Sequence, residues 1–352
     1  MAGRCRAVSP LEAQQWRRLV RAVSLDTMTA NTSSTPDLSS GLPLVVRSPA
    51  ERFLNLPDWP YERREVLVPA GPTIPGAETL SVAYVDEGPK DAIPVVMLHG
   101  EPTWGYLYRH MIRELLDLGY RVLVPDQIGF GRSDQPTDKD AYTYPAHVSW
   151  MNEWWSAVAP KNAVFFGQDW GSLVGLAVAS MHADDVRAIV IGNGILGRKF
   201  KPQEGGAFGM WQEFAATIDY LECGRMISGD LVGGVKIPLT QAESGAYDAP
   251  FPDATHQAGA LSFPSLVPTS ADQDGAKIML EAWSIFDTWE KPFETCFGVP
   301  DPVTGHGQKY FAENVPGAKR SSHTTIEGVG HFCQELGHSE LVAAIHEAAT
   351  QA

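Results

Sequence analysis

Residues 167–172, Gly-Gln-Asp-Trp-Gly-Ser, form a short polar turn between two apolar segments. The segment before the turn, 163–166, reads Ala-Val-Phe-Phe, and the segment after it, 173–179, reads Leu-Val-Gly-Leu-Ala-Val-Ala. The first is typical of a buried strand and the second of a buried helix. The two glycines and the central Asp169 keep the spacing of the strand–turn–helix motif that exposes a nucleophile at its centre. The turn therefore predicts an enzyme whose nucleophile is Asp169.

An aspartate at the centre of this turn indicates attack on a saturated carbon. A carboxylate nucleophile forms an ester with the substrate, and water must hydrolyse that ester in a second step. This chemistry suits a carbon–halogen bond or an epoxide better than a peptide or ester bond. A serine esterase is excluded, because Ser172 lies off the tip of the turn and within the expected helix.

The composition indicates a globular protein that binds neither nucleic acid nor membranes. The 352 residues are 44% hydrophobic and 20% charged, and the formal net charge is −15. Such an acidic chain is repelled by nucleic acid and by anionic membrane surfaces. No apolar run approaches the roughly 18 residues that a transmembrane helix needs. We expect a monomer whose partners are a small substrate and water.

The cysteine usage indicates a reducing compartment. Cys5, Cys223, Cys296 and Cys333 are scattered along the chain, without a Cys-x-x-Cys pair or a histidine at metal-binding spacing. We therefore expect no disulfide framework, no metal ion and no other cofactor. Free thiols fit the cytoplasm best.

Strand-like and helix-like segments alternate on both sides of the turn. Strands are expected at 80–85, 94–98, 121–126, 163–166, 188–191, 293–298 and 324–328. Helices are expected at 108–118, 150–157, 173–179, 276–289 and 341–349. This alternation is typical of an α/β protein with a doubly wound, mostly parallel sheet.

Two regions depart from this alternation. Residues 195–270 hold glycine and proline clusters, several aromatic residues and short helical patches, and they are too long for a loop. We interpret them as a helical cap inserted between two parts of the core, 47–194 and 271–352. Residues 1–46 end in a stretch rich in Thr, Ser, Pro and Asn. We expect a disordered extension there, or one wrongly assigned ahead of a true start at Met28.

The order of the candidate catalytic residues is similar to that of the α/β-hydrolase fold, in which a nucleophile is followed by an acid and then a histidine. His331 lies in Gly-Val-Gly-His-Phe at 328–332, after the last expected strand. Asp301 follows the strand at 293–298, whereas the other position for an acid, 192–194, reads Gly-Asn-Gly. Asp301 would hold His331 in one tautomer, and His331 would activate the water that hydrolyses the ester.

His99-Gly100-Glu101 follows another expected strand, at the place where the same fold supplies a backbone N–H to its oxyanion hole. We expect the amides of Glu101 and Trp170 to form this hole. The Glu101 side chain is unusual beside an anionic nucleophile. It is either protonated or positions a water molecule, and the sequence leaves both interpretations open.

Together these residues resemble the haloalkane dehalogenases, from about Pro49 to the C-terminal helix. The motifs that carry the resemblance are His-Gly-Glu-Pro-Thr-Trp at 99–104, Tyr-Leu-Tyr-Arg at 106–109, Pro-Asp-Gln-Ile-Gly-Phe-Gly-Arg-Ser-Asp at 125–134, Gln-Asp-Trp-Gly at 168–171, Ala-Pro-Phe-Pro-Asp at 249–253 and Gly-His-Phe-Cys-Gln-Glu at 330–335. As a set these motifs are specific, although epoxide hydrolases share several of them.

The resemblance implies that Asp169 displaces a halide and that His331 activates the hydrolytic water. It also implies that two indole N–H groups hold the halide, one of them from Trp170. In the subgroup of the family that has Glu after His-Gly, the second indole comes from a tryptophan of the cap. Trp211, in Phe-Gly-Met-Trp at 208–211, is the candidate for this second halide-binding residue. Indole donates a hydrogen bond and accepts none, which suits an anion.

The same resemblance places three apolar residues in the substrate pocket, namely Phe208, Phe251 and Pro252. An apolar cap excludes water and so strengthens the contacts to the halide. Leu173 stands where the family implies a bulky aromatic side chain, so the pocket departs from the family pattern at this position.

Two other functions remain open at this point. An epoxide hydrolase would share the fold and the nucleophile, but it needs cap tyrosines that protonate the opening oxygen, and Tyr220 and Tyr247 are the candidates. A non-catalytic ligand-binding protein is a further alternative, because a fold does not fix a function. Such a protein should show a damaged triad or oxyanion hole, and the sequence shows neither.

Overall fold

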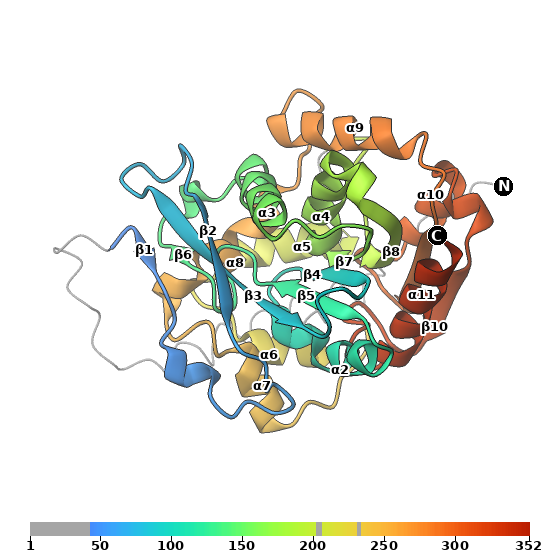
Figure 1. Cartoon of the computed structure of the whole chain (residues 1–352). Coiled ribbons are helices and arrows are strands. Elements are labelled where there is room, and N and C mark those ends of the chain that lie inside the picture. The colour runs from blue at the N-terminus through green and yellow to red at the C-terminus, as the bar shows by residue number, and fades with distance from the viewer. Residues whose placement is uncertain (1–42, 202–205, 231–233) are drawn as a thin grey trace.

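The computed structural model describes residues 43–201, 206–230 and 234–352. Its centre is an eight-stranded sheet in the order β10-β9-β8-β7-β4-β5-β3-β2 (Figure 1). The strands are β2 (Arg64–Pro69), β3 (Thr79–Glu87), β4 (Pro94–Leu98), β5 (Arg121–Pro125), β7 (Ala163–Asp169), β8 (Val186–Gly194), β9 (Phe293–Val299) and β10 (His323–Glu327). β3 is antiparallel to β2 and β5, and the other neighbours are parallel. The expected doubly wound, mostly parallel sheet is therefore confirmed.

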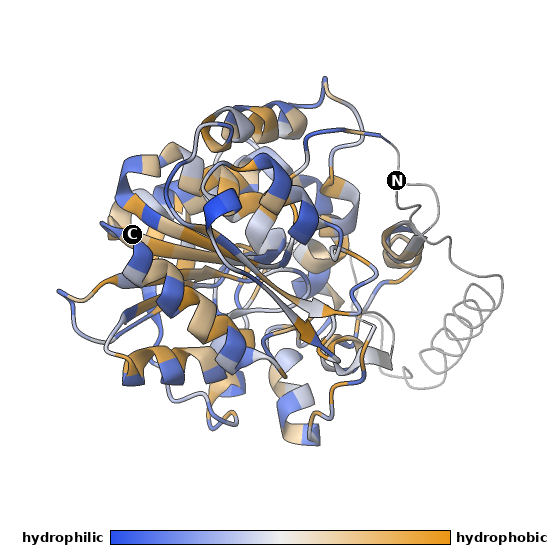
Figure 2. Ribbon diagram, turned by 90° about the vertical axis from the view of Figure 1, so that its right-hand side faces the viewer, coloured by the Kyte–Doolittle hydropathy of each residue, from blue (hydrophilic) through white to orange (hydrophobic). Residues whose placement is uncertain are grey.

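Helices cover both faces of this sheet. One face carries α2 (Arg109–Asp117) and α11 (His338–Gln351), which pack against each other. The other face carries α3 (Tyr144–Val158), α4 (Trp170–Met181), α9 (Asp274–Phe286) and α10 (Gly307–Asn314) (Figure 1). In Figure 2 the central strands are coloured mostly hydrophobic, and hydrophilic residues gather on the outer sides of the helices. The sheet is thus the buried middle layer of three.

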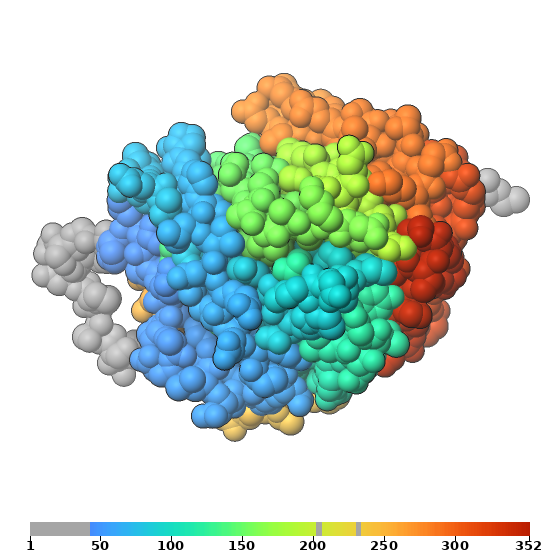
Figure 3. Space-filling view, viewed as in Figure 1, coloured from blue at the N-terminus to red at the C-terminus, as the bar shows by residue number. Residues whose placement is uncertain are grey.

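Short 3₁₀ helices lie between these elements, namely η1 (Ala50–Phe53), η2 (Gly105–Tyr108), η3 (Lys139–Ala141), η4 (Ala183–Asp185) and η8 (Ala318–Arg320). The first and last segments of the described chain lie toward opposite edges of the molecule, as the blue and red atoms of Figure 3 show. In the described ranges, every helix is too short or too polar to cross a lipid bilayer.

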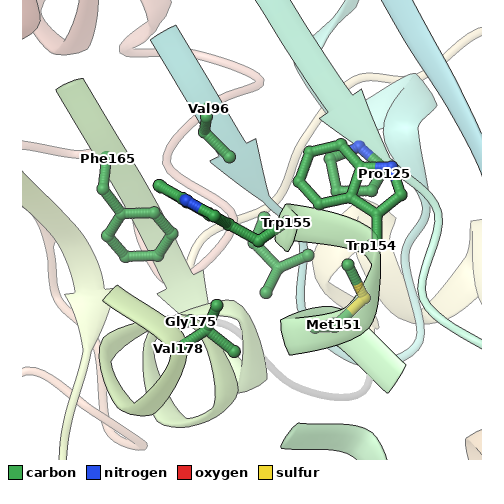
Figure 4. A pocket seen from close by; sticks show the side chains of 9 residues that line it. Val96, Pro125, Met151, Trp154, Trp155, Phe165, Gly175 and Val178 are labelled. Atoms are coloured by element: carbon green, nitrogen blue, oxygen red, sulfur yellow. The ribbon is translucent and has the colours of Figure 1, made fainter. Parts of the chain in front are cut away.

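The core lies where apolar strands meet the helix that follows the turn. Every residue of β4 is buried, and so are the first six of β7, as expected for strands covered on both faces. α4 approaches the sheet closely because Gly175 has no side chain, and an added Cβ would lie 2.2 Å from the Phe165 ring. Beside Gly175 a cavity of about 10 Å³ remains, and the Trp155 side chain extends from α3 toward Phe165 there (Figure 4). Its size and apolar lining identify this space as a packing void.

Short helices occupy the chain between β8 and α9. They are α5 (Gly206–Ala215), α6 (Cys223–Arg225), the π-helical turn η5 (Met226–Asp230), α7 (Gln241–Tyr247), η6 (Ala254–Gln257), α8 (Ala258–Ser262) and η7 (Phe263–Leu266). None of the described residues in 195–270 belongs to a strand. The division into a cap and two core parts, 47–194 and 271–352, stays a prediction that this placement supports.

The first described strand lies ahead of the boundary that the sequence analysis expects after residue 46. β1 (Val45–Val46) pairs antiparallel with β6 (Gln135–Pro136). Backbone pairing thus holds these two valines against the core, whereas the sequence analysis places them in the extension. The boundary after residue 46 stays a prediction. The expected disorder of residues 1–42, and the alternative start at Met28, lie outside the described residues.

Among the strands of the eight-stranded sheet and the helices that cover it, two have no counterpart among the expected elements. β2 is an edge strand whose residues are mostly exposed, so it lacks the apolar run that marks a buried strand. α10 has eight residues, of which Gly307 and Phe311 are buried, and so short a segment shows no clear helical period. Both elements lie where local pattern carries little information.

We expect Gly171→Ala to disrupt the turn before α4. A Cβ at this position would lie 1.7 Å from the Leu98 carbonyl oxygen, so backbone must move to accommodate it. Overpacking of this kind should lower the free energy of unfolding by about 3 kcal/mol or more. Denaturant unfolding followed by circular dichroism measures the loss.

Gly245→Ala is the matched control for that substitution. Nothing lies within 4 Å of its added Cβ, and it lies inside α7, so it should stabilise the protein by about 0.5–1 kcal/mol. A Gly171→Ala protein that unfolds like the wild type would contradict the close approach of the turn to β4.

Candidate active site

The candidate catalytic residues lie at the carboxyl ends of parallel strands. Glu101 follows β4, Asp169 ends β7, Asp301 follows β9 and His331 follows β10. With β8, which ends near Asn193, these strands are consecutive neighbours in the sheet. In open α/β sheets this edge is where ligands bind. Within the described ranges, no group of three or more His, Cys, Asp or Glu side chains is arranged to hold a metal ion.

Asp169 lies at the tip of the turn between β7 and α4. Its φ of 51° lies in a region that residues with a side chain rarely adopt, and such strain is typical of functional sites. A neighbouring glycine leaves room for its carboxylate, since a Cβ on Gly100 would lie 2.4 Å from Asp169 Oδ1. The Ser172 hydroxyl lies 2.6 Å from the Asp169 carbonyl oxygen. Ser172 therefore stabilises the turn that presents the carboxylate.

The loop after β4 supplies a donor to this carboxylate. The Glu101 amide donates a hydrogen bond to Asp169 Oδ1 at 2.9 Å. Fully buried Gln127 fixes the loop, because its side chain donates to the His99 carbonyl at 2.6 Å and its backbone amide donates to His99 Nε2 at 3.0 Å. Burial also lowers the pKa of His99, so this imidazole is neutral. The second expected donor, the Trp170 amide, stays a prediction.

Asp301 and His331 form a buried pair. His331 Nδ1 lies 3.1 Å from Asp301 Oδ2, and His331 Nε2 lies 3.6 Å from Asp169 Oδ2. Burial lowers the pKa of His331, but the charges of Asp301 and Asp169 outweigh burial and raise the pKa to about 10. One imidazole thus lies between the two carboxylates.

The side chains of two further residues hold Asp301, and the sequence analysis missed both. Asn193 Nδ2 donates to Asp301 Oδ2 at 2.8 Å, and the Thr304 hydroxyl donates to the same oxygen. Burial raises the pKa of Asp301, but His331, Thr304 and Asn193 outweigh burial and lower it. Asn193 was detectable, because it occupies the position of the alternative acid; Thr304 carries no such signal.

Two buried tryptophans lie beside these groups. Trp170 follows Asp169 in the chain and stacks on Phe263 of η7, with ring centroids 4.3 Å apart and an interplanar angle of 7°. Trp211 lies on α5, and its side chain is close enough to the Glu101 carboxyl group to lower the pKa of that group. The structure therefore brings both expected halide-binding residues next to carboxyl groups of the site.

The Glu101 carboxyl group is buried in this site. The residue is 5% exposed, and its Oε1 has no hydrogen-bond partner among the described residues. Burial and the neighbouring charge of Asp169 raise the pKa of Glu101 well above its ordinary value, against the opposing effects of Trp211 and His331. Of the two interpretations that the sequence left open, the protonated carboxyl group is favoured.

The expected pocket residues lie in different surroundings. Phe251 is fully buried, whereas Phe208 and Pro252 are half-buried. The ring that stacks on Trp170 is instead Phe263, which begins a second Phe-Pro pair in the chain. Phe263 is therefore a site residue that the sequence analysis missed. The Phe263-Pro264 pair, which repeats Phe251-Pro252, was the sequence signal that could have indicated it.

The two tyrosines expected of an epoxide hydrolase have other partners. Tyr220 donates its hydroxyl hydrogen to the Phe251 carbonyl at 2.9 Å. Tyr247 is fully buried and donates to the Glu335 carboxylate. Both hydroxyl groups are thus engaged within the protein, which does not favour their use as acids above Asp169.

A buried ion pair links the inserted helices to the loop that carries His331. Arg109 on α2 donates two hydrogen bonds to Glu335, at 2.6 and 2.8 Å, and the two side chains are 1% and 3% exposed. Glu243 of α7 lies 3.4 Å from the same guanidinium, and Tyr247 of α7 donates to Glu335. Because Glu335 follows His331 in the β10–α11 loop, this cluster joins α2, α7 and that loop.

The family model described as alpha/beta hydrolase fold matches residues 93–227. The matched range contains the Glu101 loop, the turn at Asp169 and the first inserted helices. The sheet order, the turn and the position of His331 after the last strand agree with this match. The fold and the site thus define an α/β hydrolase.

Relatives of the chain narrow this class to one family. A haloalkane dehalogenase of Mycobacterium marinum is 44% identical over 301 residues, which cover 86% of this chain and 98% of the relative. One of Mycolicibacterium paratuberculosis is 43% identical over 304 residues, covering 86% and 97%. The solved structure of haloalkane dehalogenase DpaA from Paraglaciecola agarilytica matches with a TM-score of 0.76 and 33% identity, over 85% of this chain and 96% of that one. The chain belongs to the haloalkane dehalogenase family.

We expect Glu335→Gln to lower the free energy of unfolding by about 3–5 kcal/mol, because it leaves the buried charge of Arg109 without its main partner. Denaturant unfolding measures this loss. Asp287→Asn is the control, because it breaks the ion pair between Arg198 and Asp287, whose side chains are 34% and 40% exposed. This substitution should lower the free energy of unfolding by less than about 1 kcal/mol. Similar losses in both proteins would contradict a special role for the buried pair.

Proposed function

We propose that this protein is a haloalkane dehalogenase that converts a halogenated alkane and water into an alcohol, a halide ion and a proton. One observation carries the proposal: the Asp169 carboxylate is presented by a strained turn, and its Oδ2 lies 3.6 Å from His331 Nε2. Membership of the family supports the same reaction class.

The first step is displacement of the halide by Asp169. Because the Glu101 amide holds Oδ1, the other oxygen, Oδ2, forms the bond to carbon and Oδ1 becomes the carbonyl oxygen of the ester. The carbon–halogen bond breaks, and its electron pair leaves with the halide. The indole N–H groups of Trp170 and Trp211 stabilise the halide, since indole donates without offering a competing acceptor.

The second step is hydrolysis of the ester. His331 takes a proton from water, and the resulting hydroxide adds to the carbonyl carbon of the Asp169 ester. Negative charge then develops on Oδ1, where the Glu101 amide stabilises it. This intermediate collapses when its bond to the alkoxide breaks, and the alkoxide takes the proton of the newly added hydroxyl group and leaves as the alcohol. The Asp169 carboxylate is thereby restored. Asp301 stabilises the imidazolium, which releases its proton to solvent before the next hydrolysis.

The charge of Asp169 links the two steps. In the free enzyme the carboxylates of Asp301 and Asp169 raise the pKa of His331 to about 10 against the effect of burial. Alkylation converts Asp169 into an uncharged ester and so removes one of these two charges. The pKa of His331 then falls, and the imidazole becomes a base when the ester needs one.

The remaining expectations are part of the same proposal. Protonated Glu101 donates or accepts hydrogen bonds beside the halide without repelling it, and Phe208 and Phe263 supply apolar surface for the alkyl chain. A location in the cytoplasm is supported by Cys223, Cys296 and Cys333, which are buried free thiols. The expectation of a monomer stays a prediction, since the DpaA structure is described as tetrameric.

We expect the purified protein to release bromide from 1,2-dibromoethane and chloride from 1-chlorobutane. Asp169→Ala should reduce halide release by about 10⁴-fold or more, because the nucleophile is lost. Halide assays measure both proteins, with styrene oxide hydrolysis in parallel. Diol formation without halide release would instead indicate an epoxide hydrolase, and unchanged activity of Asp169→Ala would refute the scheme.

We expect replacement of His331 by phenylalanine to leave the first step intact and block the second. The variant should release about one equivalent of halide and retain the alkyl group on Asp169, because no base activates water. Mass spectrometry of the intact protein and of the peptide that contains Asp169 detects the adduct. Continued turnover without an adduct would count against His331 as the hydrolytic base.

A further inference from the structure

Gln168, the residue before the nucleophile, is fully buried against the catalytic histidine. Its side-chain nitrogen Nε2 lies 3.2 Å from the His331 carbonyl oxygen and 3.2 Å from His331 Nε2. Its side-chain oxygen Oε1 has no hydrogen-bond partner among the described residues. Buried polar atoms without partners are uncommon and call for an explanation.

The His331 carbonyl fixes which end of the Gln168 amide faces the imidazole. A carbonyl oxygen only accepts hydrogen bonds, so the amide must present its NH₂ group to it. The second hydrogen of the same NH₂ group is then directed at His331 Nε2. Nε2 can accept this hydrogen only in the neutral imidazole, so the contact favours the state whose single proton is on Nδ1, beside Asp301.

We propose that Gln168 is a positioning residue that favours the neutral imidazole of His331, the form that must be present before water can be activated. Its NH₂ group donates to Nε2 while that atom is unprotonated and so disfavours the imidazolium. The water molecule replaces this contact at the Nε2 lone pair when it gives up its proton. This inference rests on the proposed function, because it assigns Gln168 to the ester-hydrolysis step alone.

The other groups that face His331 explain why such a donor is needed. Asp301 after β9 and Asp169 at the end of β7 both favour the imidazolium. Glu101 after β4 also interacts with the imidazole, and the Thr304 hydroxyl lies 3.4 Å from Nδ1. Among these groups, Gln168 directs a hydrogen-bond donor at Nε2, and it therefore offsets the carboxylates at the nitrogen that performs the reaction.

The donor also explains why Oε1 remains unpaired. If the amide were reversed, Oε1 would face the His331 carbonyl oxygen, and two acceptors would repel each other. The contact with the backbone carbonyl therefore keeps the NH₂ group toward the imidazole, and Oε1 is left without a partner.

The test uses Gln168→Met, which keeps the length of the side chain and removes both amide groups. In rapid-mixing experiments with 1,2-dibromoethane, the halide burst reports alkylation and the later formation of alcohol reports ester hydrolysis. The apparent pKa of ester hydrolysis should rise by about 1, so hydrolysis near neutral pH should slow about tenfold. The rate should recover in alkaline buffer, and the halide burst should stay close to that of the wild type.

Gln257→Met is the matched control, because it removes a fully buried amide from the inserted helices, away from His331. Its pH profile of ester hydrolysis should coincide with that of the wild type. A Gln168→Met enzyme that is slower by the same factor at every pH, or unchanged, would overturn the inference. If the wild type itself releases no halide, the proposed function fails, and this outcome is distinct from the failure of Gln168 alone.

A second measurement requires no change at position 168. In the Asp169→Asn protein, the amide imitates the uncharged ester, and ¹⁵N chemical shifts of His331 report which nitrogen carries the proton. We expect a protonated Nδ1 and an unprotonated Nε2 at neutral pH. A protonated Nε2 in this protein would overturn the inference, even if Gln168→Met fails to fold.

Discussion

At Asp169 the chain passes from a buried strand into a buried helix within one residue, and it does so with a φ of 51°. The surrounding packing must hold this conformation, because a residue with a side chain does not adopt it freely. Gly171 admits the Leu98 carbonyl, Gly100 leaves space for the carboxylate, and Ser172 contacts the Asp169 carbonyl. The nucleophile can therefore be exposed only because both adjoining elements are deeply buried and their positions are fixed.

The site controls charge by giving chemically similar groups different surroundings. Hydrogen bonds from Thr304 and Asn193, together with His331, keep Asp301 ionised despite its burial. Glu101 lacks such donors at Oε1, and its pKa is raised. The pKa of the His331 imidazole depends on which of the neighbouring carboxyl groups is charged. In the proposed cycle, the chemical state of one carboxylate thus decides when the histidine can act as a base.

The sequence predicted the elements with strong local patterns, such as the apolar strands β4 and β7 and the glycine-flanked turn between β7 and α4. It also predicted which residues would meet, because a parallel sheet brings the carboxyl ends of its strands to one edge. Local pattern gave no signal for the exposed edge strand β2. It gave none for the stacking of Phe263 on Trp170 or for the contact of Gln168 with His331. These contacts depend on how distant segments pack, which single residues do not encode.

The cluster around Arg109 limits how freely the inserted helices can be exchanged. The insertion enters and leaves the core between β8 and α9, so it resembles a module that could be grafted from one relative to another. However, α7 supplies Glu243 and Tyr247 to a buried cation whose main partner is Glu335. A grafted insertion that lacks a carboxylate at position 243 or a phenol at position 247 would remove contacts to Arg109 and Glu335. It would thereby disturb the loop that carries His331. Among the helices between β8 and α9, those that lie away from α7 can therefore change their sequence with the least effect on the loop of His331.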